Sequence, residues 1–195
     1  MENSFLWAQL FGLIAMTCTI IAMQLKNPRH IILSGVPSGM LWATQYFLLG
    51  ATMGAIANAS SALKNLLSAF VPQHYLPYIL GLYLTMIWGI GLYNLSAWYG
   101  ICPLIGASTP TIALLINRDN RRLYARAVII CCAFWACYNS IVGSWMGLCC
   151  DTLTITSSLI GMYRHEQWDI GKCYRTFLPS LYKSLFSNPI PKTYP

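Results

Sequence analysis

The chain has 195 residues, of which 56% are hydrophobic and only 9% are charged. A typical soluble domain carries about 25% charged residues, so this composition excludes an ordinary solvated surface. The apolar stretches are continuous rather than alternating, which also excludes a β-barrel. We therefore expect an all-α integral membrane protein with the lipid bilayer as its main partner.

Seven apolar runs are long enough to cross a bilayer, which takes about 20 mainly apolar residues per helix. The sequence predicts about seven transmembrane helices joined by short loops. The N-terminus begins Met-Glu and lacks the basic region and cleavage site of a secretory signal, so the first run is expected to be retained as a helix. The runs cover residues 5–25, 31–49, 53–71, 75–95, 98–116, 123–142 and 147–164.

The basic residues are distributed very unevenly between the two sides of this topology. Every Lys and Arg except Lys64 lies in or close to the turn after the first run, in or close to the turn between the fifth and sixth runs, or at or after the end of the seventh run. Lys64 lies in the third run near the same side. Basic residues are retained on the cytoplasmic side, which predicts an outside N-terminus and a cytoplasmic C-terminus. This distribution explains the net charge of +7 without a nucleic-acid partner. The tail, residues 166–195, has the pattern of an interfacial amphipathic helix.

The chain contains an internal repeat with an offset of 93 residues. This offset aligns Trp42-Ala43 with Trp135-Ala136, Gly50 with Gly143, Met53-Gly54 with Met146-Gly147, and Asn58 with Asp151. Transporters are often built from duplicated halves. We expect two parallel three-helix repeats, residues 1–73 and 97–165, joined by a linker helix at 74–96 and followed by the tail.

Polar residues inside the predicted spans are the candidate binding site. In each repeat a Trp on the second helix precedes a polar residue on the third by sixteen positions: Trp42 with Asn58, and Trp135 with Asp151. An amide or carboxylate within the hydrocarbon must find partners in the bundle interior. We expect these four residues to border a central cavity for a small polar solute. Packing between helices is the alternative role for the polar pair.

Two further residues belong to this hypothesis. Tyr46 and Asn139 lie one turn after the two Trp residues, on the same helix faces. They are the secondary candidates for contact with the solute. Asp151 is the only acidic residue placed inside a span, and it can carry a coupled proton, pair with Lys64, or stay neutral. Lys64 is expected to extend toward the cytoplasmic interface.

Catalytic and metal-binding motifs are missing from the sequence. The eight cysteines show no CxxC spacing and mostly fall in apolar runs, so we interpret them as small hydrophobic residues, with a metal or redox role as the alternative. The histidines fall at predicted helix ends, and no phosphate loop, zinc signature or pair of carboxylates appears. We expect neither an enzyme nor a bound cofactor or metal ion.

Several short motifs together resemble the YgjV family of bacterial inner membrane proteins. The resemblance covers most of the chain and implies a multi-pass protein of the bacterial inner membrane, without implying a particular reaction. The motifs are Trp7-x-Gln9-x-x-Gly12-x-x-Ala15, Tyr46-Phe47-Leu48-Leu49-Gly50, Asn58, Gly89-x-Gly91-Leu92, Pro103-x-x-Gly106, and Trp135-x-x-Tyr138-Asn139 with Gly143-Ser144.

More distantly, the three-plus-one-plus-three plan resembles the SWEET sugar transporters, the PQ-loop proteins and the nicotinamide riboside carriers. In SWEETs a Trp and an Asn of each repeat contact the substrate. The matching residues here are Trp42, Asn58 and Trp135, with Asp151 in place of the second Asn. The resemblance implies a transporter or facilitator of a sugar, riboside or similar metabolite. The alternative is a non-transporting scaffold, receptor or partner subunit, and the sequence leaves a homo-oligomer open.

Overall fold

The computed structural model describes residues 2–23, 25, 28–117 and 120–166, and within them it is all-helical, without a strand. This confirms the all-helical part of the predicted fold class. The predicted amphipathic helix of the tail lies outside the described residues. The helices are α1 (Glu2–Met23), α2 (Pro28–Leu48), α3 (Thr52–Phe70), α4 (Leu76–Tyr93), α5 (Ile101–Ile116), α6 (Arg121–Val142) and α7 (Trp145–Glu166), with short 3₁₀ helices at Gln73–Tyr75 and Trp98–Gly100.

The chain divides into two units, residues 1–158 and 159–195. All contacts described below lie within the first unit, which holds α1 to α6 and the beginning of α7. The second unit contributes the end of α7 to the described residues.

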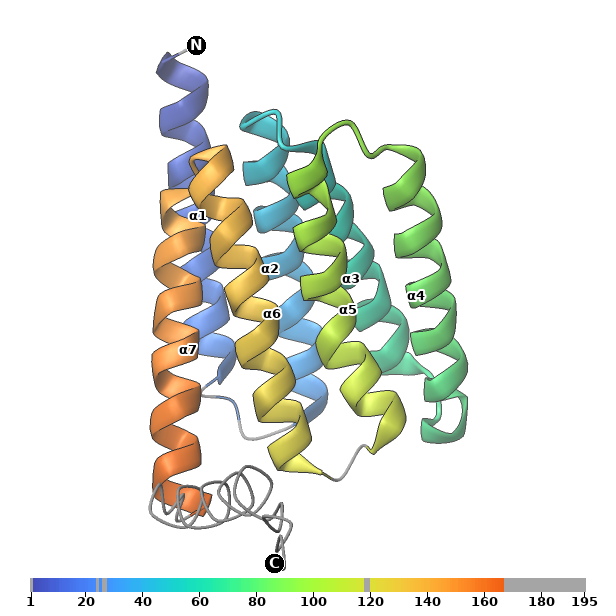
Figure 1. Cartoon of the computed structure of the whole chain (residues 1–195). Helices are drawn as coiled ribbons and strands as arrows, with labels where there is room; N and C mark the ends of the chain where they lie inside the picture. The colour runs from blue at the N-terminus through green and yellow to red at the C-terminus, as the bar shows by residue number, and fades with distance from the viewer. Residues whose placement is uncertain (1, 24, 26–27, 118–119, 167–195) are drawn as a thin grey trace, which may run out of the picture. The chain divides into compact units, whose positions relative to one another are not determined.

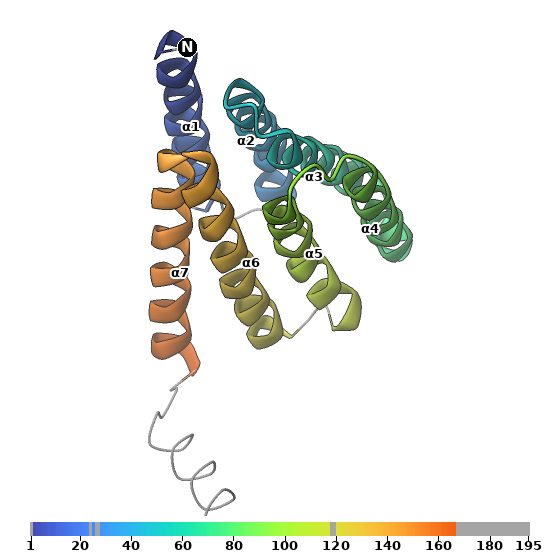
Figure 2. The same cartoon turned by 45° about the horizontal axis from the view of Figure 1, so that its top comes forward.

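From α1 to α6, helices that are consecutive in the sequence pack against each other. Helix α2 packs against both α1 and α3, α4 packs against α3 and α5, and α5 packs against α6. Figures 1 and 2 show α2 between α1 and α3, and α4 beside α3 and α5. The start of α1, the α2–α3 turn, the α4–α5 connection and the α6–α7 turn all lie at one end (Figure 1), called here the N-terminal end.

Four helices are apolar and long enough, by length and composition alone, to cross a membrane. They comprise residues 3–22, 76–93, 98–116 and 122–142 of the described chain. The helices α2, α3 and α7 have similar lengths, 21, 19 and 22 residues, but carry more polar side chains. Some of these side chains are buried, including Ser38 and Gln45 of α2 and Ser60 of α3. The polar residues of α2 and α3 therefore face the protein interior at these positions.

The turns that end α2 and α6 have the same backbone structure. Gly50 and Gly143 adopt positive φ angles of 70° and 72°, which glycine reaches without steric cost. In each turn the following residue donates back to the carbonyl five residues earlier: Ala51 N to Tyr46 O at 2.8 Å, and Ser144 N to Asn139 O at 3.0 Å. This is the Schellman ending of a helix. The two glycines aligned by the 93-residue offset thus make the same reversal.

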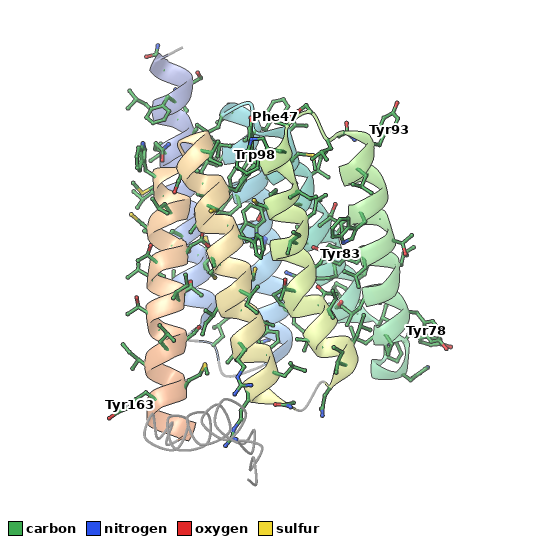
Figure 3. All side chains as sticks on the ribbon, in the orientation of Figure 1. Phe47, Tyr78, Tyr83, Tyr93, Trp98 and Tyr163 are labelled. Atoms are coloured by element: carbon green, nitrogen blue, oxygen red, sulfur yellow. The ribbon has the colours of Figure 1, made fainter. Side chains whose placement is uncertain are left out.

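Exposed aromatic side chains lie near both ends of the first unit. Phe47, Tyr93 and Trp98 extend from the N-terminal end, and Tyr78 from the opposite end (Figure 3), each with at least 74% of its surface exposed. Tyr83, by contrast, is buried in the core beside Ile87 and Leu104. Aromatic rings favour the boundary between hydrocarbon and headgroups. Their placement suits a bundle whose two ends meet two membrane surfaces.

Candidate functional site

A chain of hydrogen bonds links α2, α6 and α7 near the N-terminal end. The Tyr46 hydroxyl donates to Asn139 Oδ1 at 2.7 Å, and Asn139 Nδ2 donates to Asp151 Oδ2 at 2.8 Å. Tyr46 and Asn139 are each only 2% exposed, while Asp151 is partly buried. Three of the six predicted site residues are therefore in direct contact.

Local structure explains why these three side chains meet. Tyr46 and Asn139 lie in the last turns of α2 and α6, just before the two matching glycine turns. Asp151 lies in the second turn of α7, so the α6–α7 reversal returns it to the level of Asn139. The two residues of the Tyr46–Asn139 bond are 93 positions apart, which is the repeat offset itself.

The aromatic candidates pack on both sides of Tyr46. Its ring centroid lies 6.4 Å from that of Trp42 and 5.5 Å from that of Trp135. Trp135 approaches α5 so closely that a Cβ atom on Gly106 would lie 2.9 Å from its ring. Trp42 and Tyr46 share a helix face, as their spacing of four residues predicts. The two Trp residues and Tyr46 form one aromatic row beside the polar chain.

Asn58 takes no direct part in the Tyr46–Asn139–Asp151 hydrogen bonds. Its Nδ2 donates to the carbonyl of Gly54, one turn earlier in its own helix, at 3.0 Å. Within the described residues no hydrogen bond joins Asn58 to Asp151. Trp42 likewise bonds elsewhere, because its Nε1 donates to Thr19 Oγ1 of α1 at 3.4 Å. The structure thus assembles Trp42, Tyr46, Trp135, Asn139 and Asp151, with Asn58 connected through Gly54.

Lys64 and Asp151 form no ion pair, although both lie in the described part of the chain. The Lys64 Nζ atom instead sits 4.7 Å from the ring centroid of Tyr83 on α4. A cation over an aromatic face is stabilised by the ring quadrupole. The pairing of Lys64 with Asp151 considered from the sequence does not occur, because Lys64 faces α4 while Asp151 bonds to α6.

Sequence reasoning missed a second set of polar contacts around the site. Gln45 is fully buried, and its Nε2 donates to Ser144 Oγ at 3.1 Å. Gln9 of α1 contacts the α6–α7 turn twice: Nε2 donates to Gly143 O at 3.0 Å, and Oε1 accepts from Met146 N at 3.3 Å. The signal that could have revealed these residues is simple, since each is a polar amide in an otherwise apolar run.

One polar atom of this set has no partner. Gln45 Oε1 is buried and, within the described residues, accepts no hydrogen bond. A buried carbonyl without a donor costs about 1–3 kcal/mol. The Gln45 amide is held against α1 because Gly12 has no side chain, and a Cβ atom there would lie 2.5 Å from Gln45 Nε2. The site therefore contains one acceptor that a donor group or a water molecule could satisfy.

The described residues contain no group of three or more His, Cys, Asp or Glu side chains that could hold a metal ion. The chemistry available at the site is instead hydrogen bonding by amides and hydroxyls, one carboxylate, and the faces of aromatic rings. Such a set suits the binding of a small polar molecule.

Comparison with known proteins gives one result. Residues 6–168 match the family Imp-YgjV, which is described as bacterial inner membrane protein. Searches of curated proteins and of solved structures found no match. The matched segment covers most of the 195 residues and includes every residue of the candidate site. This confirms the resemblance found in the sequence: the chain belongs to the YgjV family of bacterial inner membrane proteins.

Proposed function

We propose that the protein is a carrier or facilitator of a small polar solute, which binds between two parallel three-helix repeats. The observation that carries the proposal is the Tyr46–Asn139–Asp151 chain. It joins the first repeat, residues 1–73, to the second, residues 97–165, through two residues at equivalent positions. The proposed role is binding and passage of the solute, without a chemical step.

In this proposal all seven helices cross the membrane, including the three that are less apolar. A helix rises 1.5 Å per residue, so even the 19 residues of α3 approach the roughly 30 Å thickness of the hydrocarbon. The polar residues of α2 and α3 are tolerated because several are buried in the bundle. Helices that line a solute path are expected to be more polar than helices that face lipid.

The proposed orientation places the N-terminal end outside the cell. The connections at that end, residues 49–51, 94–97 and 143–144, contain no Lys or Arg, whereas Arg122 and Arg126 lie in the first two turns of α6 at the opposite end. Basic residues close to helix ends are retained in the cytoplasm. The N-terminal end is therefore called the outer end below.

The site offers a polar solute three kinds of contact. Asp151 can accept hydrogen bonds from hydroxyl or amino groups. The rings of Trp42 and Trp135 offer flat apolar faces on which a sugar or base can stack. Because Asp151 has no cationic partner among the described residues, its carboxylate can be stabilised by hydrogen bonds from a bound solute or neutralised by a proton. A donor group of the solute could replace the Asn139 amide as the hydrogen-bond partner of Asp151. The Asn139–Asp151 bond would then break, and Asp151 would still have a partner.

The rival role is a static membrane scaffold, receptor or partner subunit, in which the same hydrogen bonds only hold helices together. Polar contacts between helices are common in membrane bundles and stabilise them modestly. The two roles differ in one measurable respect. A carrier has a specific solute whose binding stabilises the folded state and which crosses the membrane, whereas a scaffold or partner subunit binds none and a receptor binds its ligand without moving it across.

A panel of solutes tests the proposal by thermal unfolding of the detergent-purified protein. The panel contains sugars, nucleosides, vitamins and amino acids. A ligand at about 100 times its dissociation constant stabilises a protein by about 2.7 kcal/mol. We expect a specific solute to raise the unfolding temperature of the wild type, and the rise to disappear in Asp151→Asn. A matched control is Asn94→Ala, an exposed position whose side chain bonds only to its own helix. The absence of a shift with every solute would support the scaffold role.

A further inference from the structure

A pocket opens at the outer end, above the aromatic row. It has a volume of about 160 Å³. Its walls are the α2–α3 turn, residues 96, 97, 99 and 100 between α4 and α5, and the C-terminal end of α6. Among the residues that line it are Thr52, Ser96, Tyr99 and Tyr138, and no lining residue carries a charge.

Tyr138 lies between this pocket and the candidate site. It lines the pocket, and its ring centroid is 5.9 Å from that of Tyr46 and 6.0 Å from that of Trp135. The Tyr138 side chain is only 1% exposed. A solute moving inward from the pocket would meet this ring before it reached the polar chain.

The Tyr138 hydroxyl also holds the start of α3. Gly54 is the third residue of α3, and its N–H is one of the first-turn donors that have no partner inside a helix. Ala51, at the N-cap of α3, supplies no side-chain hydrogen bond. The Gly54 N–H instead donates to the Tyr138 hydroxyl at 3.0 Å. This single bond ties the ring of α6 to the first turn of α3.

The first half of the chain likewise supplies a hydrogen-bond acceptor to the first turn of α7. Met146 is the second residue of α7, and its first-turn N–H donates to Gln9 Oε1 of α1. Each half therefore caps the third helix of the other. The hydrogen bonds of Gln9, Gln45, Tyr46 and Gly54 to the second half all lie near the two glycine turns. These bonds join the two halves at the outer end.

We propose that the outer pocket is an access site for a neutral polar solute and that Tyr138 is the door between this site and the Tyr46–Asn139–Asp151 chain. This inference rests on the proposed function and extends it. A charged solute would lose hydration in the pocket without meeting an opposite charge, which is unfavourable. The pocket offers hydroxyls and backbone groups of the turns for hydrogen bonds, and two Tyr rings for stacking. These groups suit a neutral solute that has hydrogen-bonding groups and a flat face.

The spacing around Tyr138 explains why it can act as a door. A Cβ atom on Gly54 would lie 2.8 Å from the rings of both Tyr138 and Tyr46, so the rings close tightly against the bare backbone of α3. Rotation of Tyr138 breaks only one hydrogen bond. Loss of one hydrogen bond of typical strength changes an opening equilibrium by roughly fivefold.

The door is tested by chemical access to residue 58, which lies one turn deeper in α3. A water-soluble maleimide is applied to purified Asn58→Cys protein, and labelling at residue 58 is measured by mass spectrometry of its peptide. We expect Tyr138→Phe, which keeps the ring and removes the hydroxyl, to raise the labelling rate by roughly fivefold. The matched control is Tyr83→Phe, because Tyr83 is also buried and its hydroxyl bonds to Ser61 within the first half and linker.

A second substitution shows whether the reagent passes through the pocket. Ala97 lines the pocket, and Ala97→Phe fills part of it, so the increase caused by Tyr138→Phe should disappear. Ala59→Phe is the control at an exposed alanine that does not line the pocket. An unchanged rate in Tyr138→Phe, an equal increase in Tyr83→Phe, or an increase that survives Ala97→Phe would overturn the door.

The solute class is tested at the rim of the pocket. Maleimide labelling of Ser96→Cys should be slowed by at least one neutral probe among D-glucose, ribose and uridine, and not by glutamate or spermidine. Equal protection by charged probes, or protection by none, would overturn the access site. Both labelling experiments are independent of transport. A solute-induced rise in unfolding temperature without these labelling effects leaves the proposed function standing and removes the access site and the door. The labelling effects without such a rise remove the proposed function.

Discussion

Tyr46 and Asn139 occupy the same position in the two halves of the chain and bond directly to each other, with 2.7 Å between the Tyr hydroxyl and the amide oxygen. The Asn139 amide nitrogen continues the contact to Asp151. Buried hydrogen bonds of this kind fix the relative position of the helices that carry them. The contact between these two residues therefore joins the last turns of α2 and α6, near the N-terminal end.

Tyr46→Phe should lower the free energy of unfolding by about 1–3 kcal/mol, because Asn139 Oδ1 then stays buried without a donor. The measurement is thermal or denaturant unfolding in detergent. Tyr83→Phe is the comparison, and it should have a smaller effect because Ser61 is only partly buried. Equal stability of Tyr46→Phe and the wild type would show that the bond does not hold the halves together.

Asp151→Asn should leave stability nearly unchanged, whereas Asp151→Leu should lower it. The amide oxygen of the Asn variant can still accept from Asn139 Nδ2, and Leu leaves that buried donor unpaired at a cost of about 1–3 kcal/mol. Unfolding midpoints of the two variants give the comparison. If both variants lost stability equally, the negative charge of Asp151 rather than its acceptor oxygen would be what the fold requires.

Gly54→Ala should destabilise the protein by about 1–3 kcal/mol, since the added methyl group would press on the rings of Tyr46 and Tyr138. Gly81→Ala on α4 is the matched control, because nothing lies within 4 Å of a Cβ atom there. Replacing a helical glycine in open space by alanine favours the helix by about 1 kcal/mol. Opposite signs for the two substitutions are expected in unfolding experiments, and a tolerated Gly54→Ala would contradict the tight ring packing.

Gln9→Leu should release the start of α7 from α1. The substitution removes the acceptor of the Met146 N–H and the donor to Gly143 O, so hydrogen exchange at the Met146 amide should become faster. Thr17→Val is a suitable control because the Thr17 hydroxyl bonds only to Leu13 of its own helix. Unaltered exchange at Met146 in Gln9→Leu would mean that Gln9 does not cap α7.

The helices could be predicted from the sequence because each coincides with a run of mainly apolar residues of helical length. The predicted runs agree with α1 to α7 to within a few residues, and the aligned Gly50 and Gly143 mark two turns of the same shape. The start of α5 differed in the kind of helix. The run was expected to begin at residue 98, where the chain instead forms the 3₁₀ helix Trp98–Gly100 before α5 begins at Ile101.

The candidate site could be predicted only in part. The repeat alignment identified Tyr46, Asn139 and Asp151, but it suggested that Asn58 would behave like Asp151, its aligned partner. Asn58 instead bonds to Gly54 because an amide can donate to a carbonyl one turn back in its own helix, which a carboxylate cannot do. Contacts such as Gly54 with Tyr138 depend on how distant helices pack, and no spacing along the chain reveals them.

The central claim is that the protein moves a solute through the site between its halves, and solute uptake into proteoliposomes tests it most directly. The solute is the one that raises the unfolding temperature most, and the variants are wild type, Asp151→Asn and the control Asn94→Ala. We expect saturable uptake by wild type and Asn94→Ala and at least a tenfold loss in Asp151→Asn, which corresponds to about 1.4 kcal/mol. Uptake by all three proteins no faster than in empty liposomes, or equal saturable uptake by Asp151→Asn, would contradict the claim.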